Sequence, residues 1–184
     1  MADSAIVPSS TFCADIQTAS GQEINLCYQC KKCAAGCPMS FVMRPMNSDI
    51  VKLTQLGQRE AVFNSNALWT CVDCKTCGAR CPNGIDISRI MDALRQQTIE
   101  KQLAVSDNKT PAFHQAFMTS VSQLGRIFEA GVIGLYKFKS ATYTQDLALG
   151  VKFLLKQKLR LLPERVKNMR QIQQIFQKAK EERP

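Results

Sequence analysis

Two copies of one cysteine pattern constrain this chain more than any other feature. Each copy reads Cys-x-x-Cys-x-x-Cys-x-x-x-Cys-Pro, and the copies cover residues 27–38 and 71–82. Three cysteines at intervals of three can ligate three irons of a cubane from one turning loop, and the fourth iron then points away from that loop. The spacing therefore predicts two [4Fe–4S] clusters, with one-electron transfer as their chemistry.

The fourth ligand of each cluster is expected to come from the other motif, as in two-cluster ferredoxins. The first cluster is then held by Cys27, Cys30, Cys33 and Cys81. The second is held by Cys71, Cys74, Cys77 and Cys37. This crossing would tie the two halves of the domain together and bring the clusters close enough for electron tunnelling.

Residues beside the cysteines fit the same interpretation. Pro38 and Pro82 have a fixed φ and no N–H, so they turn the chain out of the site after the last ligand. Gly36 and Gly78 would let the backbone approach the inorganic sulfurs, where N–H donors raise the reduction potential. Cys13 lies outside both motifs and is expected to be a free or structural thiol.

Other uses of the eight cysteines stay open at this point. They could hold two zinc ions in a zinc-stabilised basic binding module, although zinc sites usually show two separated Cys-x-x-Cys pairs. Disulfides would require an oxidising compartment. The N-terminal sequence Met-Ala-Asp-Ser-Ala lacks the layout of a secretory signal, and no apolar run has the length of a membrane span. We therefore expect a protein of the reducing cytoplasm.

The segments around the motifs favour an all-α fold. Residues 47–63 show apolar positions at helical spacing, with an interruption at Gly57, and Asp86 is a suitable N-cap for a helix that runs to about residue 104. No alternating strand pattern separates the motifs. We expect an α-helical two-[4Fe–4S] ferredoxin domain, with Trp69 shielding the second cluster or packing in the core beside it.

Three parts are expected along the chain. Breakers such as Pro8 and Gly21 suggest that residues 1–22 form an irregular N-terminal arm. Residues 23–105 would form the ferredoxin domain, and residues 106–184 a helical C-terminal extension.

The extension is expected to contain further amphipathic helices. The first would begin at Thr110 and end at Gly131, the second would begin at Thr144, and the last would run from Glu164 to about Lys180. Their apolar faces could cover the ferredoxin domain or dock on a partner subunit.

Positive charge is concentrated in the same extension. The chain has a formal net charge of +9, and residues 132–184 contain twelve Lys and Arg against four Asp and Glu. This distribution is typical of a solvated helix face or a docking surface. Nucleic acid is not an expected partner, because no basic stripe with interleaved aromatic residues accompanies the charge.

The motif sequences carry a family resemblance. Residues 26–38, LCYQCKKCAAGCP, and residues 68–87, from LWTC to RCPNGIDI, resemble the two cluster motifs of the C-type iron–sulfur subunit of heterodisulfide reductase. Residues 159–176, with Leu-Leu-Pro before a basic helix, are similar to the end of that protein. The cysteine motifs alone also occur in iron–sulfur subunits of succinate, glycerol-3-phosphate and lactate dehydrogenase complexes, which leaves such a complex as the alternative.

The resemblance implies an electron relay. In that family, the C-type subunit receives electrons from an A-type subunit, which contains flavin and iron–sulfur clusters, and passes them to a B-type subunit, which cleaves a disulfide. Hydrogenase or formate dehydrogenase modules belong to some of the wider complexes. This chain has neither the catalytic cysteine-rich motif of the B-type subunit nor a Gly-rich flavin fingerprint, so we expect no catalytic residue in it.

Overall fold

The computed structural model divides the chain into two compact units, residues 1–107 and 108–184. The residues that it describes are 10–101, 103, 109–142, 150, 152–153, 155–156 and 162–181. Within these residues all regular structure is helical and no strand occurs, so the expected all-α fold is confirmed.

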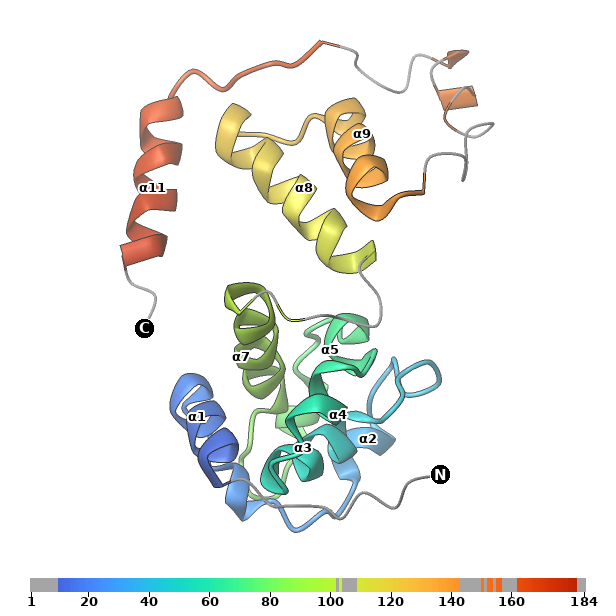
Figure 1. The fold of residues 1–184 in the computed structure, drawn as a ribbon, viewed down its shortest axis with the longest axis vertical. Helices are drawn as coiled ribbons and strands as arrows, with labels where there is room; N and C mark the ends of the chain where they lie inside the picture. Colours follow the sequence, from blue (N-terminus) through green and yellow to red (C-terminus); the bar gives the residue numbers. More distant parts are fainter. Residues whose placement is uncertain are drawn as a thin grey trace. The chain divides into compact units, whose positions relative to one another are not determined.

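The first unit contains short helices that alternate with the cysteine loops (Figure 1). In chain order these are α1 (Ser10–Ser20), the 3₁₀ turn η1 (Ile24–Leu26), α2 (Lys32–Ala35), α3 (Asn47–Gln55), α4 (Arg59–Phe63), α5 (Ala67–Thr70), α6 (Thr76–Ala79) and α7 (Ile87–Glu100). Each cysteine motif contains one four-residue helix, α2 in the first motif and α6 in the second.

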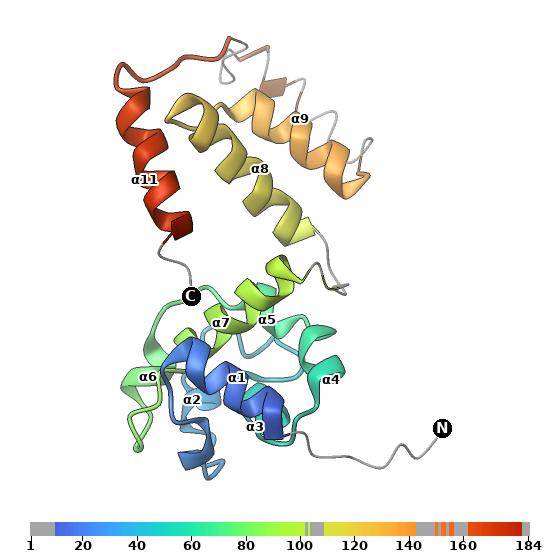
Figure 2. The ribbon, with the colours of Figure 1, turned by 60° about the vertical axis from the view of Figure 1, so that its left-hand side comes forward.

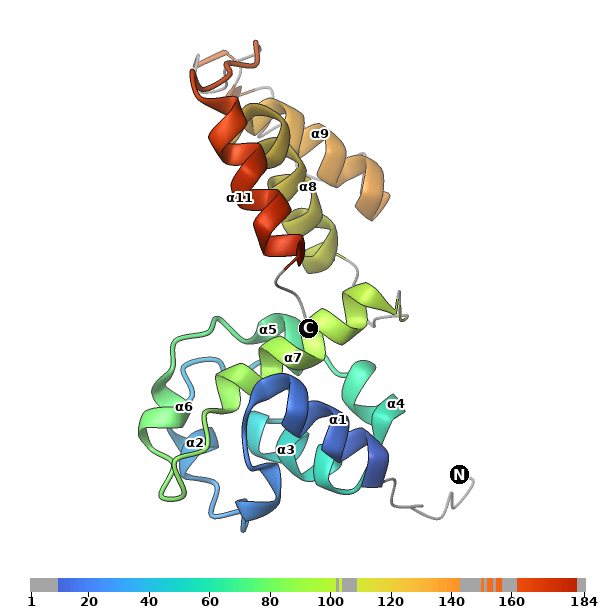
Figure 3. The ribbon, with the colours of Figure 1, turned by 90° about the vertical axis from the view of Figure 1, so that its left-hand side faces the viewer.

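The core of the first unit lies where α1, α3 and α7 pack against one another, as Figures 2 and 3 show from two further sides. Ile16 from α1, Ile50 from α3 and Ile90 from α7 are fully buried there. Burying an aliphatic side chain of this size contributes about 1.5–3 kcal/mol. The cysteine loops thus rest on a conventional apolar core, which also includes Trp69.

The expectation of an irregular N-terminal arm is wrong for residues 10–20, which form α1. Phe12, Cys13 and Ile16 bury one face of this helix in the core. The Phe12 ring meets the Phe63 ring edge-on at 5.7 Å, and the Arg59 guanidinium lies 5.6 Å from the centre of the Phe12 ring. The apolar residues are few, but their helical spacing places them together on one face.

Two further expectations are confirmed in the first unit. The helical segment after the first motif is interrupted at Gly57, where φ is +70° and α3 gives way to α4. Asp86 caps α7, because its carboxylate accepts a hydrogen bond of 3.0 Å from the Ser88 backbone N–H. Met46 occupies the cap position of α3, and its backbone N–H donates to the Asp49 carboxylate.

The second unit consists of α8 (Lys109–Leu124), α9 (Glu129–Ser140) and α11 (Met169–Glu181) in its described part. Helix α8 ends at Gly125, where φ is +75°, rather than at the expected Gly131, which lies inside α9. Gly125 adopts the left-handed conformation that ends many helices, and glycine does so readily because it lacks a Cβ. The helix therefore stops before Gly131. Val166 donates a backbone hydrogen bond to Leu124 and leads the chain towards α11.

Helix α8 packs on α9, where Ala116 of α8 and Val132 of α9 are buried, and α11 lies along α8 (Figure 1). The predicted apolar face of the last helix is only half-buried, at Met169, Ile172 and Phe176. The helix expected to begin at Thr144 falls largely outside the described residues. No described helix combines the length and the apolar character that crossing a bilayer requires.

Candidate metal centre

The two cysteine loops have the same backbone conformation at equivalent positions. Gln29 and Lys31 flank Cys30 and have φ values of 61° each. Asp73 and Lys75 flank Cys74 with φ values of 52° and 62°. A left-handed conformation costs a residue with a Cβ about 1–2 kcal/mol of conformational free energy. Each loop contains two such residues. Such strain typically persists at functional sites.

The first cavity of the site is bordered by both loops. Its thiols are those of Cys27, Cys30, Cys33 and Cys81. Three of them belong to the first motif and the last belongs to the second. Val51, Ile85 and Ile87 supply an apolar wall.

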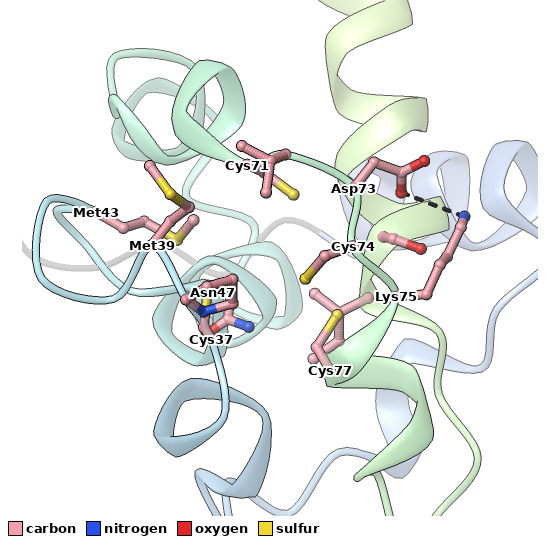
Figure 4. A pocket seen from close by; sticks show the side chains of 13 residues that line it. Cys37, Met39, Met43, Asn47, Cys71, Asp73, Cys74, Lys75 and Cys77 are labelled. Carbon is pink, nitrogen blue, oxygen red and sulfur yellow. Dashed lines mark ion pairs between the residues drawn. The ribbon is translucent and has the colours of Figure 1, made fainter.

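The second cavity has the reciprocal composition. Its thiols are those of Cys37, Cys71, Cys74 and Cys77. In Figure 4, Cys71, Cys74 and Cys77 follow one another along the second loop, while Cys37 comes from the other side of the cavity with Met39 and Met43. The structure thus brings together the same two sets of four cysteines that the sequence analysis groups.

The donor set of each cavity fits a cubane. Four thiols from two loops surround one space, and each iron of a cubane takes one thiolate. Among the described residues, no three His, Cys, Asp or Glu side chains lie close enough together to hold a single metal ion. Ligands of a cubane stand on four different irons and are therefore further apart than the ligands of one zinc ion.

Hydrogen bonds hold the two loops together. The Asn83 side-chain amide donates to the Leu26 carbonyl beside the first cysteine. The Asp86 backbone N–H donates to Gln22 Oε1 at 2.7 Å. Within the first half, the buried Asn47 amide at the start of α3 donates to the Cys33 carbonyl at 3.3 Å. Helices α2 and α6 also pack on each other. The second motif is thereby anchored to the chain that enters the first.

The cysteines differ in their exposure to water, and the second cysteine of each motif is the exposed one. Cys30 and Cys74 are exposed, whereas Cys33 is 9% exposed. Exposed apolar side chains stand near them, Tyr28 at 63% and Val72 at 60%. Each cavity therefore has one thiol at an edge that a partner could approach.

Burial and local hydrogen bonds shift the pKa values of several thiols. Burial raises the pKa of Cys33 to about 11 and also raises the pKa of Cys77. Burial is the largest influence on Cys71 too and raises its pKa, although the Arg95 charge acts in the opposite direction. The pKa of Cys74 is lowered, chiefly by its contact with the Thr76 hydroxyl at 3.4 Å.

One side chain braces the start of each loop, and the sequence analysis did not identify either of them. From α3, Gln55 Nε2 donates at 2.9 Å to both the Ile24 and the Cys27 carbonyls. From α7, Arg95 donates to the Leu68 carbonyl at 2.5 Å and to the Cys71 carbonyl. In each loop the acceptors are the first cysteine and the residue three positions before it. Both donors lie on the helix that follows their motif, but nothing in their residue types singles them out.

Gly36 and Gly78 both have close protein neighbours. A Cβ on Gly36 would stand 2.5 Å from Arg80 Cδ, and one on Gly78 would stand 3.3 Å from Asp86 Oδ1. Their missing side chains make room for protein neighbours. Cys13 is buried in the core, with its Sγ 3.4 Å from Gln17 Oε1 and 3.5 Å from Asn25 Oδ1.

Comparison with known proteins agrees with this geometry. Residues 23–85 match the model of a family described as the 4Fe-4S dicluster domain. The chain is also 29% identical over 139 residues to a C-type iron–sulfur subunit of the CoB–CoM heterodisulfide reductase of Methanocaldococcus jannaschii, a match that covers 74% of each chain. The chain is therefore similar to a C-type iron–sulfur subunit of heterodisulfide reductase, and its first unit carries a 4Fe-4S dicluster domain.

Proposed function

We propose that this chain holds two [4Fe–4S] clusters and relays electrons between two partner subunits of a heterodisulfide-reductase-like complex. Cys27, Cys30, Cys33 and Cys81 would ligate one cluster. Cys37, Cys71, Cys74 and Cys77 would ligate the other. The observation that carries the proposal is this reciprocal lining of the two cavities, in which each loop supplies three thiols to one cavity and one thiol to the other.

The clusters would supply one-electron chemistry, and the residues of this chain would hold them and exclude water. Met39, Met43 and Ile87 line the second cavity, and Ile85, Ile87 and Val51 line the first. Apolar walls of this kind reduce solvent access, which is one of the factors that set a reduction potential. The chain would need no catalytic group of its own.

The electron donor would be an A-type subunit that contains flavin, and the acceptor would be a B-type subunit that reduces a disulfide, both within the cytoplasm. The name of the Methanocaldococcus relative supports a complex of this type. The edges at Cys30 and Cys74 would be the points of closest approach for the partners, because the thiols there are exposed. The substrate disulfide would lie in the B-type subunit.

Analysis of the anaerobically isolated protein tests the proposal. We expect about eight iron and eight acid-labile sulfide per chain, and an electron paramagnetic resonance (EPR) signal after dithionite reduction. Two zinc ions and no sulfide would overturn it in favour of a zinc-stabilised module.

Isolation of the native complex tests the choice of partners. Co-purification with a flavoprotein and a cysteine-rich subunit supports the relay from an A-type to a B-type partner. Co-purification with a membrane cytochrome or a different dehydrogenase subunit would instead assign the chain to another oxidoreductase.

A further inference from the structure

The two loop braces described above are equivalent in position and different in charge. Gln55 and Arg95 each reach from the helix after a motif to the carbonyl of that motif's first cysteine. Gln55 is neutral, whereas the guanidinium of Arg95 is permanently charged at physiological pH. The two cysteine loops are therefore supported by the same construction with one unit of positive charge added at the second loop.

The Arg95 charge is sheltered from water, which strengthens its electrostatic effect on the second loop. Its side chain is 16% exposed, and two of its donor atoms are occupied by the Leu68 and Cys71 carbonyls. A positive charge in such a place favours the addition of an electron nearby more strongly than a solvated charge does. Net local charge is one of the factors that set the potential of an iron–sulfur cluster.

Other charges and donors act on the two loops as well. Asp92 lies 3.1 Å from Arg95, but its side chain is 51% exposed. Asp73 carries a negative charge in the second loop and is paired with Lys75 at 3.2 Å. In the first loop, Gln29 Nε2 donates to Cys27 Sγ at 3.3 Å. Each loop also carries a lysine at the edge of its cavity, Lys31 in the first and Lys75 in the second. Arg95 counteracts the Asp73 carboxylate, for which the first loop has the neutral Gln29 at the equivalent position.

We propose that Arg95 is a tuning residue, whose charge selectively raises the reduction potential of the electron carrier held at the Cys37, Cys71, Cys74 and Cys77 cavity. Gln55 performs the same bracing at the other cavity without changing its potential. Arg95 then contributes to the difference in reduction potential between the two carriers. This inference rests on the proposed function, because it requires a one-electron carrier in each cavity.

The test is a redox titration followed by EPR on the cluster-loaded full-length protein. Arg95→Gln retains an amide donor and removes the charge. We expect this variant to lower the midpoint potential of one of the two carriers. At a fixed potential, the ratio of reduced to oxidised carrier should fall at least tenfold, which corresponds to about 59 mV for one electron. Gln55→Arg adds a charge to the other loop, and we expect it to raise the other midpoint.

Two further variants separate charge from support. Arg95→Lys keeps the charge but loses the two-pronged guanidinium, so the midpoint should stay near that of the wild type while thermal stability falls. Arg89→Gln removes an exposed charge from the same helix, where the side chain is 63% exposed, and should shift neither midpoint by as much as Arg95→Gln.

The outcomes distinguish this inference from the function on which it rests. A protein without iron and EPR signal would reject the proposed function itself. Two intact signals that do not move in Arg95→Gln, or that move together by the same amount, would reject the tuning role alone. If Arg95→Gln does not fold, an unchanged midpoint in Gln55→Arg would reject the tuning effect of a charge at the brace.

Discussion

The Arg80 side chain lies directly against Gly36, and the two residues occupy equivalent positions in the two cysteine motifs. Each is the C-cap of a four-residue helix, Gly36 of α2 and Arg80 of α6. A Cβ on Gly36 would stand 2.5 Å from Arg80 Cδ and 2.6 Å from Arg80 Nε. The repeated loops thus meet at a point where one copy must lack a side chain so that the other can place a long one.

Replacing Gly36 by Ala should therefore push Arg80 out of its place between the loops. We expect a loss of about 1 kcal/mol, the low end for an overpacked position, because Arg80 is exposed and can move. The decrease should be visible in the thermal unfolding of the cluster-loaded protein. The double variant Gly36→Ala, Arg80→Ala is the control, since it removes the clashing side chain and should lose less than the sum of the single variants. Additive losses would contradict the contact.

Crossed ligation makes a prediction about single cysteines. Cys81→Ser should disturb the cluster bound by Cys27, Cys30 and Cys33, because Cys81 lines their cavity. Cys37→Ser should disturb the other cluster. EPR of the reduced variants would show which of the two signals changes in each case.

The buried Cys13 provides the matched control for both variants. Cys13→Ser should leave the iron content and both signals as they are, since Cys13 lines neither cavity and its Sγ lies beside Gln17 and Asn25. Loss of the signal of the Cys71 loop in Cys81→Ser would mean that each motif ligates its own cluster.

The sequence predicted the cysteines of the site better than the residues that hold the cysteine loops in place. Cysteine spacing identified three ligands of each cavity, because ligand spacing is a local property of a loop, and the pattern of two-cluster ferredoxins supplied the crossed fourth ligand. Helix α7 was predictable for the same reason, since its cap Asp86 and its apolar stripe are adjacent in the sequence.

Features that depend on distant contacts were not predictable in this way. The two braces donate to carbonyls more than twenty residues away, Gln55 to Ile24 and Cys27 and Arg95 to Leu68 and Cys71. Helix α1 was missed because the breakers on either side of it outweighed a short apolar stripe, which becomes informative only when α3 and α7 are present to cover it. The left-handed residues of the loops are Gln, Lys and Asp rather than Gly, so their types do not reveal their conformation.

The cap of α7 should contribute measurably to stability. Asp86→Ala removes the acceptor for the Ser88 N–H and should cost about 1 kcal/mol, whereas Asp86→Asn keeps an acceptor and should cost much less. Thermal unfolding at pH 7 would measure both. Equal losses in the two variants would show that the charge of Asp86, rather than its capping bond, is what matters.

The same residue should contribute to stability in a pH-dependent way. Burial acts to raise the pKa of Asp86, but the hydrogen bonds from Ser88 and the charge of Lys75 outweigh it, and the net shift is downward. Its contribution is therefore complete above the unfolded value of about 3.9 and is lost as the pH falls through the folded value. The difference in stability between the wild type and Asp86→Asn should stay constant from pH 7 to 5 and change only below about pH 4. A change that begins near neutral pH would assign the effect to another group.

The cysteine thiols should differ in their rate of alkylation once the iron–sulfur clusters are removed under native conditions. The pKa of Cys74 is lowered and its side chain is exposed, whereas Cys33 is buried with a pKa of about 11. Because the thiolate is the nucleophile, iodoacetamide at pH 8 should modify Cys74 first, and only about one Cys33 in a thousand would be ionised. Peptide mass spectrometry would follow both sites.

The pH dependence separates ionisation from access in that experiment. The rate at Cys33 should rise about tenfold per pH unit until the pH approaches 11, while the rate at Cys74 should level off at a lower pH, because the pKa of Cys74 is lowered. Thr76→Val removes the hydroxyl that stabilises the Cys74 thiolate, so the plateau at Cys74 should move to higher pH and the rate at pH 8 should fall. A Cys74 rate that is unchanged in Thr76→Val would mean that exposure alone makes this cysteine reactive, and that the hydroxyl does not act on the thiol at the edge of the second cavity.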